Sequence, residues 1–278
     1  MRSLTVLNIL ICVSLLAGCG PELVTPDFAT PSYQDHPNLR TAELARARGD
    51  IPQAIHDYRD IIKEEGPPCE PAYIGLGMSL LDANAVEEAK KTFEKALALF
   101  PRSTCAFVGM GAIYLILNQP ENAIKSFDCA LAINPRCAKA LNGRGIALDM
   151  LGDICGAQAN YKAAIELDPS NVSYKSNQAL SLALAGNTRG AICELERLVQ
   201  SPCTTPRVRQ NLALAYGLAG NKKMARKIGR VDLPDEMVKN NINYIEAVQQ
   251  TQDYAGLISK NHTVPLDESR KWEEGDSK

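Results

Sequence analysis

The sequence predicts an all-α fold, a solenoid of about five to six stacked helix pairs that ends in a C-terminal capping helix. Proline, glycine, alanine and aromatic residues each recur at intervals of 34 residues. The recurring positions are Pro101, Pro135 and Pro169; Gly77, Gly111 and Gly145; Ala89, Ala123 and Ala157; and Phe93, Phe127 and Tyr161. A fixed period of about 20–50 residues is typical of repeat proteins, in which each unit buries its apolar face only by stacking on its neighbours.

The order of residues within one period resembles the tetratricopeptide repeat (TPR). The clearest copies begin at Tyr73 and Phe107 with an aromatic residue, an apolar residue and a glycine, and continue with Ala-x3-Phe and a closing proline. This resemblance implies two antiparallel helices in each unit and a right-handed superhelical stack. It also implies a scaffold that binds other molecules more often than a catalyst.

Helix packing explains the spacing of the small residues. The recurring glycine and the first alanine are expected where the two helices cross most closely, since a larger side chain there would cost roughly 1–3 kcal/mol through overpacking. The recurring Phe or Tyr is expected to fill the space between the helices and toward the next unit. The closing proline ends the second helix, because it has no N–H and its ring clashes with the preceding turn.

Residues 1–18 are predicted to be a lipoprotein signal peptide. A basic start at Arg2 precedes an apolar run over residues 4–17, which is too short to span a bilayer comfortably. The run ends in Leu-Ala-Gly-Cys at residues 16–19, which resembles the bacterial lipobox. That resemblance implies cleavage before Cys19 and lipidation of its thiol and amine. The alternative is an uncleaved anchor helix with a chance cysteine.

The next residues indicate where the lipidated protein would lie. Gly20 stands where Asp would signal inner-membrane retention in such lipoproteins, so we expect the periplasmic face of the outer membrane of a Gram-negative bacterium. Residues 19–37 are predicted to be the lipidated cysteine and a proline-rich tether, in which residues 20–36 favour an extended chain of about 3.1 Å per residue and reach about 50 Å. The alternative is a short ordered strip along the first repeat.

The TPR solenoid with its capping helix is predicted over residues 38–250. Pro234 and the acidic residues after it begin the capping helix at 235–250, because proline and acidic side chains are favoured in a first turn. The polar residues 251–278 are predicted to be a mobile tail. The expected repeats are a degenerate first unit at 38–66, four units at 70–103, 104–137, 138–171 and 172–205, and a fading sixth unit from about 206.

Several patterns argue against nucleic-acid or nucleotide binding. The 30 Lys and Arg residues nearly balance the 32 Asp and Glu residues, which gives no electrostatic reason to expect nucleic acid. The Gly-x-Gly pairs that begin at Gly75, Gly109 and Gly143 lack the third glycine of a dinucleotide-binding loop. Because these pairs recur every 34 residues, we assign them to helix packing.

The sequence also gives no reason to expect an enzyme. His36, His56 and His262 are far apart and lack a partner motif such as H-E-x-x-H, and there is no C-x-x-C motif. We therefore expect no catalytic residues, no cofactor, no metal and no small-molecule substrate. A thiol- or metal-dependent enzyme remains the less favoured alternative.

Seven cysteines follow Cys12 and Cys19, at positions 69, 105, 129, 137, 155, 193 and 203. We expect most of them to be buried as small apolar residues. The periplasm permits disulfides, and the cysteines near repeat junctions, Cys69, Cys105, Cys137 and Cys203, are the candidates for bridges.

The candidate protein-binding groove lies on the first helix of each pair. In TPR arrays this helix lines the concave surface, which here nominates Ile74, Met78, Val108, Ala112, Leu115, Asn142, Ile146, Ser176, Leu180 and Gln210. The set is largely apolar, and Lys139 is an isolated cation, so an apolar or amphipathic partner segment fits better than a charged tail. The alternative is that several of these side chains only pack against neighbouring repeats.

The end of the array contains Asp232-Leu-Pro and then Asn240-Asn-x-x-Tyr. With the lipobox and the repeats, this closing motif resembles the TPR lipoprotein of the tight-adherence (Tad/Flp) pilus system, over Cys19 and roughly residues 38–250. The resemblance implies a pilotin-like accessory protein of type IVb-like pilus assembly, which helps an outer-membrane secretin to localise or assemble. The cysteines and the degenerate first repeat depart from it. The alternative is a TPR lipoprotein adaptor in cell-envelope biogenesis, with a cell-wall hydrolase or an outer-membrane assembly factor as partner.

Overall fold

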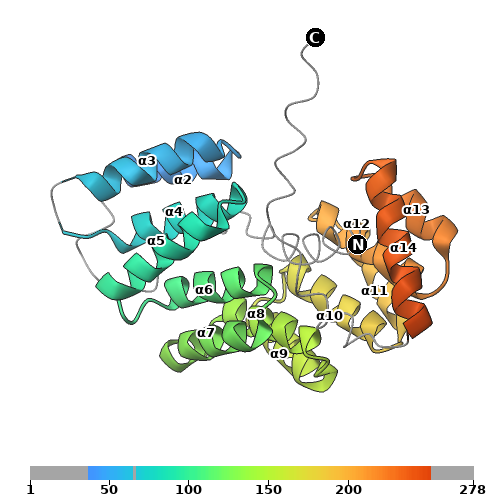
Figure 1. Cartoon of the computed structure of the whole chain (residues 1–278). Coiled ribbons are helices and arrows are strands. Elements are labelled where there is room, and N and C mark those ends of the chain that lie inside the picture. Colours follow the sequence, from blue (N-terminus) through green and yellow to red (C-terminus); the bar gives the residue numbers. More distant parts are fainter. Residues whose placement is uncertain (1–36, 65–66, 252–278) are drawn as a thin grey trace, which may run out of the picture.

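The computed structural model describes residues 37–64 and 67–251, and within them it contains thirteen helices and no strand. The predicted all-α TPR solenoid is therefore confirmed. The helices follow one another around an arc that has α2 and α3 at one end and α12, α13 and α14 at the other (Figure 1). The signal peptide, the tether up to residue 36 and the predicted tail from residue 252 lie outside the described residues.

Six helix pairs and one closing helix make up this stack. The second helix of the last pair, α13, has only 8 residues, consistent with the fading of the repeat in the sequence. None of the helices in the described part of the chain is both long and apolar enough to span a membrane. The pairs are α2 (Pro37–Ala47) with α3 (Ile51–Lys63), α4 (Glu70–Asp82) with α5 (Val86–Leu99), α6 (Thr104–Ile116) with α7 (Pro120–Ile133), α8 (Ala138–Met150) with α9 (Ile154–Leu167), α10 (Val172–Leu184) with α11 (Thr188–Val199), and α12 (Pro206–Leu218) with α13 (Lys222–Gly229), and α14 (Asp235–Thr251) closes the stack.

The recurring aromatic rings fit between glycines of two consecutive repeats. A Cβ atom added at Gly77 would lie 2.6 Å from Cζ of Phe93, and one added at Gly109 in the next repeat would lie 2.4 Å from the same atom. Phe127 is enclosed in the same way by Gly111 and Gly143. The Gly-x-Gly pairs thus make room for one ring from the preceding repeat and one from their own, which confirms their assignment to packing.

A residue with a left-handed backbone makes the turn between the two helices of each pair. Asparagine and glycine are favoured there, because they adopt a positive φ at the lowest steric cost. After four of these six turns a polar side chain caps the second helix, as Asp153 does by accepting a hydrogen bond from the amide of Gly156. The left-handed residues after the first repeat keep the 34-residue period: Asn84, Asn118, Gly152, Gly186 and Gly220.

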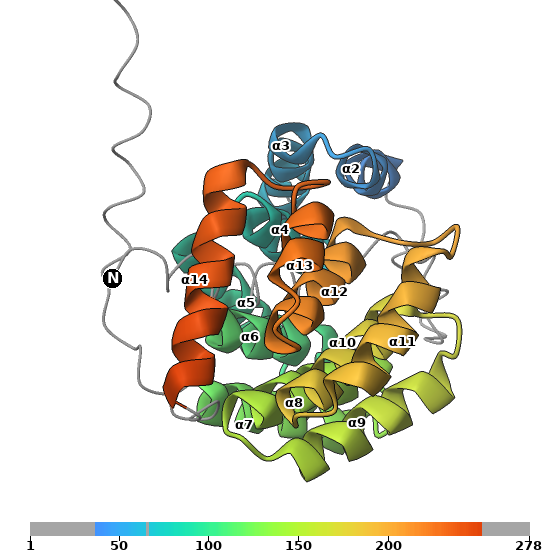
Figure 2. The same cartoon turned by 90° about the vertical axis from the view of Figure 1, so that its right-hand side faces the viewer.

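The first helices line the inner side of the arc. Each of α4, α6, α8, α10 and α12 packs directly on the first helix of the preceding repeat. In a curved stack the helices on the inner side lie closer together than those outside, so the second helices lie on the outer side (Figures 1 and 2). The closing helix α14 packs on both α12 and α13 and covers the last pair.

Candidate functional site

The inner face of the first helices is the candidate binding surface, and all ten predicted groove residues lie on these helices. Six of them are at most 8% exposed, because neighbouring first helices pack closely together: Ala112, Leu115, Asn142, Ile146, Ser176 and Leu180. The other four, Ile74, Met78, Val108 and Gln210, are half-buried. Only these four keep substantial side-chain area that a partner could touch.

The N-terminal part of the inner face is apolar. Ile74 and Met78 lie on α4, and Val108 occupies on α6 the position that Ile74 occupies one period earlier. Their side chains pack on two buried clusters that together extend over the first four repeats, and they remain partly exposed. We call these three residues the apolar strip. Half-buried apolar side chains on helices suit the apolar face of an amphipathic partner segment.

The C-terminal part is linked by hydrogen bonds between consecutive first helices. Asn177 Nδ2 on α10 donates to Asn142 Oδ1 on α8 at 2.9 Å. One period later, Asn211 Nδ2 on α12 donates to Ser176 Oγ on α10, also at 2.9 Å. Asn177 stands one period after Gly143, so side-chain hydrogen bonds replace the glycine contacts of the earlier repeats. The predicted groove residues Asn142 and Ser176 therefore have partners inside the stack.

A buried carboxyl group, Asp149, lies on α8 and is absent from the predicted groove residues. Its Oδ2 accepts a hydrogen bond from the Tyr161 hydroxyl at 2.8 Å, and its Oδ1 accepts one from the Ser181 hydroxyl at 2.7 Å. Burial raises the pKa of Asp149 from 3.8 to about 7, although the two hydrogen bonds lower it. Leu115 stands one period earlier, so the exchange of an apolar for an acidic residue is the sequence signal that identifies this position.

The closing motif fastens the end of the stack. Asp232 forms a two-point ion pair with Arg209 on α12, and Gln210 Nε2 donates to Asp232 Oδ2 at 3.3 Å. Ile245 on α14 belongs to the same buried cluster as Leu180. The predicted groove residues Gln210 and Leu180 thus help to hold the closing segment in place.

Two family models of the tetratricopeptide repeat match the chain, one over residues 39–104 and the other over residues 106–137. Residues 39–104 and 106–137 are therefore tetratricopeptide repeats, and the described helices form a TPR solenoid. TPR arrays are scaffolds that bind protein partners, and their fold is typically non-enzymatic. Comparison with curated protein sequences finds no match.

Solved structures of TPR proteins resemble this chain in fold. A TPR protein of Thermus thermophilus is 22% identical with a TM-score of 0.58, over 64% of this chain and 96% of its own. One from Parabacteroides merdae is 18% identical with a TM-score of 0.57, over 85% and 93%. The pilF protein of Pseudomonas aeruginosa is 22% identical with a TM-score of 0.50, over 68% and 88%. At these identities the likeness concerns the fold alone.

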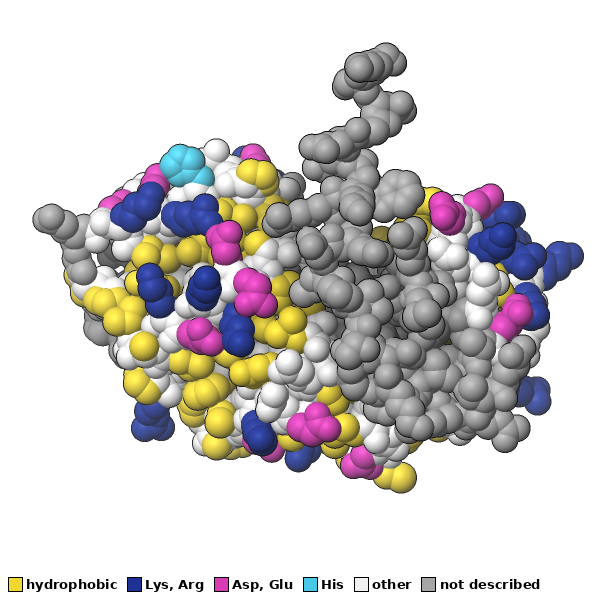
Figure 3. Space-filling view, in the orientation of Figure 1, with side chains coloured by type: hydrophobic (Ala, Val, Ile, Leu, Met, Phe, Trp, Pro, Cys, Tyr) yellow, Lys and Arg dark blue, Asp and Glu magenta, His cyan; other side chains and the backbone are white. Residues whose placement is uncertain are grey.

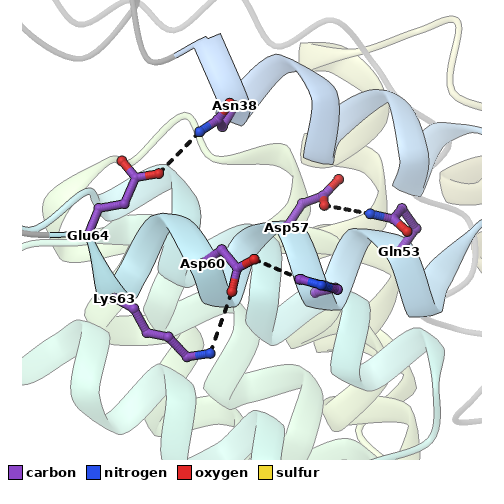
Figure 4. A network of polar contacts seen from close by, with 7 residues as sticks. Asn38, Gln53, Asp57, Asp60, Lys63 and Glu64 are labelled. Carbon is purple, nitrogen blue, oxygen red and sulfur yellow. Dashed lines mark hydrogen bonds and ion pairs between the residues drawn. The ribbon is translucent and has the colours of Figure 1, made fainter.

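The one described histidine of this TPR protein lies on the outer surface of α3. His56 Nδ1 is 2.9 Å from Asp60 Oδ2, and Lys63 Nζ approaches the other oxygen of Asp60 at 3.5 Å (Figure 4). These side chains are at least half exposed, so the contacts belong to a solvated helix face. Within the described residues, no three His, Cys, Asp or Glu side chains gather as metal ligands would.

The expectation that most of the cysteines are buried is wrong. We expected most of them to be buried, but only Cys69 is buried and Cys137 is half-buried, whereas the other five are exposed. No disulfide joins any of the seven described cysteines, including the four candidates at repeat junctions. The five exposed ones are Cys105, Cys129, Cys155, Cys193 and Cys203.

This exposure predicts two classes of thiol reactivity. Burial raises the pKa of Cys69 and of Cys137, which leaves less of the reactive thiolate at neutral pH. We expect iodoacetamide to modify Cys129, Cys155 and Cys193 in the native protein at least about tenfold faster than Cys69. Mass spectrometry after timed modification measures each rate. Equal rates in the native protein would contradict the described burial.

Proposed function

We propose that this TPR protein is a lipid-anchored scaffold of the outer membrane that binds a partner protein during assembly of a Tad/Flp-type pilus. The lipobox-like residues ending in Cys19 support the anchor, and the closing motif at Asp232 supports the pilus system. The partner proposed is the secretin, or another component of the assembly machinery, so the role is pilotin-like. The protein acts by holding its partner and not by catalysis.

The apolar strip is the observation that supports partner binding best. Ile74, Met78 and Val108 lie on the inner sides of two adjacent helices and remain partly exposed, whereas the equivalent face farther along the stack is filled by internal hydrogen bonds. An amphipathic partner helix could bury its apolar face on this strip. Its polar face would then turn toward solvent or toward the polar C-terminal half of the arc.

Replacing Val108 by glutamate tests this binding mode. A charge on the α6 side of the apolar strip would have to lose its water in the complex, so we expect capture of the partner to fall at least about tenfold. The measurement is a cross-linked pull-down of the lipidated protein from cell envelopes, with the bound proteins identified and quantified by mass spectrometry. Thermal unfolding shows whether the variant keeps its fold.

Leu99→Glu is the matched control, because it introduces the same charge at an apolar residue that is 45% exposed at the end of the outer helix α5. It should capture as much partner as the unsubstituted protein. A secretin among the captured proteins would support the pilus role, and cell-wall hydrolases or outer-membrane assembly factors in its place would support the adaptor role. The anchor is tested separately, since Cys19→Ser should leave the precursor unprocessed.

A further inference from the structure

The charge on α13 distinguishes it from every other second helix. Helices α3, α5, α7, α9 and α11 each contain both acidic and basic residues. The sequence of α13, Lys-Lys-Met-Ala-Arg-Lys-Ile-Gly, contains four cations and no acidic residue, and Arg230 follows directly. Blue side chains gather at the end of the molecule where α13 lies (Figure 3). Opposite charges therefore balance on the outer face of the other repeats but not on this one.

The cations of α13 lie on one side of the helix. Lys223, Arg226, Lys227 and Arg230 follow the spacing i, i+3, i+4 and i+7, which places them on one face, and all four are exposed. The opposite side packs inward, where Ala225 belongs to a buried cluster with α14. The cationic face therefore points away from the stack. We call these four residues the basic face.

Most of the basic face is not neutralised within the protein. Lys222 beside it pairs with Glu246 at 2.7 Å, and Arg230 pairs with the exposed Asp235 at 2.7 Å. Among the described residues, no ion pair involves Lys223, Arg226 or Lys227. Three long cationic side chains thus remain available on the outside of the last repeat.

An exposed apolar residue directly follows the last cation of the basic face in the sequence. Val231 follows Arg230 and is 65% exposed, which makes it the most exposed of the large hydrophobic residues that the structure describes. Basic side chains beside an exposed apolar one match the boundary between lipid headgroups and acyl chains. An acidic peptide held by its charges alone would leave Val231 in water, and the partner segment proposed above binds the inner side of the stack.

We propose that the basic face of α13 with Val231 binds a surface of anionic phospholipid. The cations would contact lipid phosphates, and Val231 would enter the headgroup layer. This inference rests in part on the proposed lipid anchor, which would keep the protein beside a membrane. The two ends of the arc turn to the same side, α2 at one end and α13 at the other (Figure 1). A tether that enters at α2 and a basic face on α13 could therefore hold the arc against the membrane at two points.

Vesicle binding of the lipidated full chain tests the proposal. The protein is mixed with vesicles of phosphatidylcholine alone and with vesicles that also contain phosphatidylglycerol, and bound protein is measured by sedimentation. Each basic residue near an anionic surface strengthens binding about fivefold, so replacing Lys223, Arg226 and Lys227 by glutamine should weaken binding to the anionic vesicles about 100-fold. Raising the salt from about 0.1 M to about 1 M should remove the preference for anionic vesicles, because the Debye length falls from about 10 Å to about 3 Å.

The control removes the same number of charges from α5, where acidic residues balance them. Replacing Lys90, Lys91 and Lys95 by glutamine should leave the preference for anionic vesicles within about twofold of the unsubstituted protein. Equal weakening by both triple substitutions would show that net charge and not the basic face matters, and would overturn the proposal. Unchanged binding of the α13 variant would also overturn it.

Two further outcomes separate this proposal from its alternatives. Binding to phosphatidylcholine alone reports the lipid anchor, so its absence would contradict the anchor while the comparison between the two kinds of vesicle still tests the basic face. Poly-glutamate replaces the vesicles in a parallel titration. If it bound the basic face and the anionic vesicles did not, the partner would be an acidic protein surface and the lipid assignment would be wrong.

Discussion

Replacing Phe127 by alanine is expected to lower the free energy of unfolding by about 3–5 kcal/mol. The ring is 1% exposed and lies between Gly111 of its own repeat and Gly143 of the next. Removing the ring leaves a cavity at the junction of two repeats. The surrounding helices can move together only in part, so the cavity does not close completely. Urea unfolding followed by circular dichroism measures the loss.

Two further variants examine the cause of this loss. Leu99→Ala removes an apolar side chain that is 45% exposed and should change stability by at most about 0.5 kcal/mol. Gly143→Ala should be destabilising alone, since its Cβ would lie 2.3 Å from Cζ of Phe127, and less so in the Phe127→Ala background, where that ring is missing. Additive effects of the two changes would show that the ring and the glycine do not share one packing site.

Replacing Asp149 by asparagine is expected to make the protein more stable at pH 8 and to reduce its loss of stability with rising pH. Burial raises the pKa of Asp149 to about 7 in the folded protein, above its ordinary value of 3.8. Between these two values the folded protein binds more protons than the unfolded chain, so stability falls as the pH rises and the contribution is lost above about pH 7. The stability gained by the substitution should grow by about 2–3 kcal/mol between about pH 5 and pH 8.

Asparagine has nearly the same shape as aspartate and can still bond to the Tyr161 and Ser181 hydroxyls, so the variant changes the charge and little else. Asp50→Asn is the matched control, because Asp50 is exposed at the start of α3, where it caps the helix through the amide of Gln53, and asparagine also caps helices well. Urea titrations at a series of pH values give the free energies. A gain for Asp149→Asn that is the same at both ends of the pH range would show that the carboxyl group does not titrate as described.

The fold could be predicted because the same packing solution recurs along the chain. The spacing of Phe93, Phe127 and Tyr161 and of the glycines around them defines where each pair of helices crosses, and the structure places the rings at those crossings. The period alone does not reveal how closely the first helices approach one another. For that reason six predicted groove residues are buried in the stack, and the half-buried apolar strip is smaller than the predicted groove.

The cysteines were misplaced because their residue type was given more weight than their position in the repeat. Cys129 stands one period after Lys95, and Cys155 stands one period after Glu121, and all four residues are exposed on outer helices. Asp149 is a polar residue at a buried position: Leu115 is buried at the equivalent position one period earlier, and the carboxyl group of Asp149 is buried likewise. Comparing each residue with its equivalents in the other repeats would have placed all three correctly.

The shared fit of rings and glycines has a consequence for how this chain can gain or lose length. Phe93 packs on Gly109 in the same way as Phe127 packs on Gly143 in the next repeat. Deleting or duplicating one whole 34-residue repeat here would therefore leave every ring with a matching pair of glycines. Beyond that boundary, Asp149 depends on a hydroxyl from the following module. Whole repeats of the N-terminal half can therefore be exchanged without losing a ring–glycine contact. Removing the repeat after Asp149 would also remove a hydrogen-bond donor to its carboxyl group.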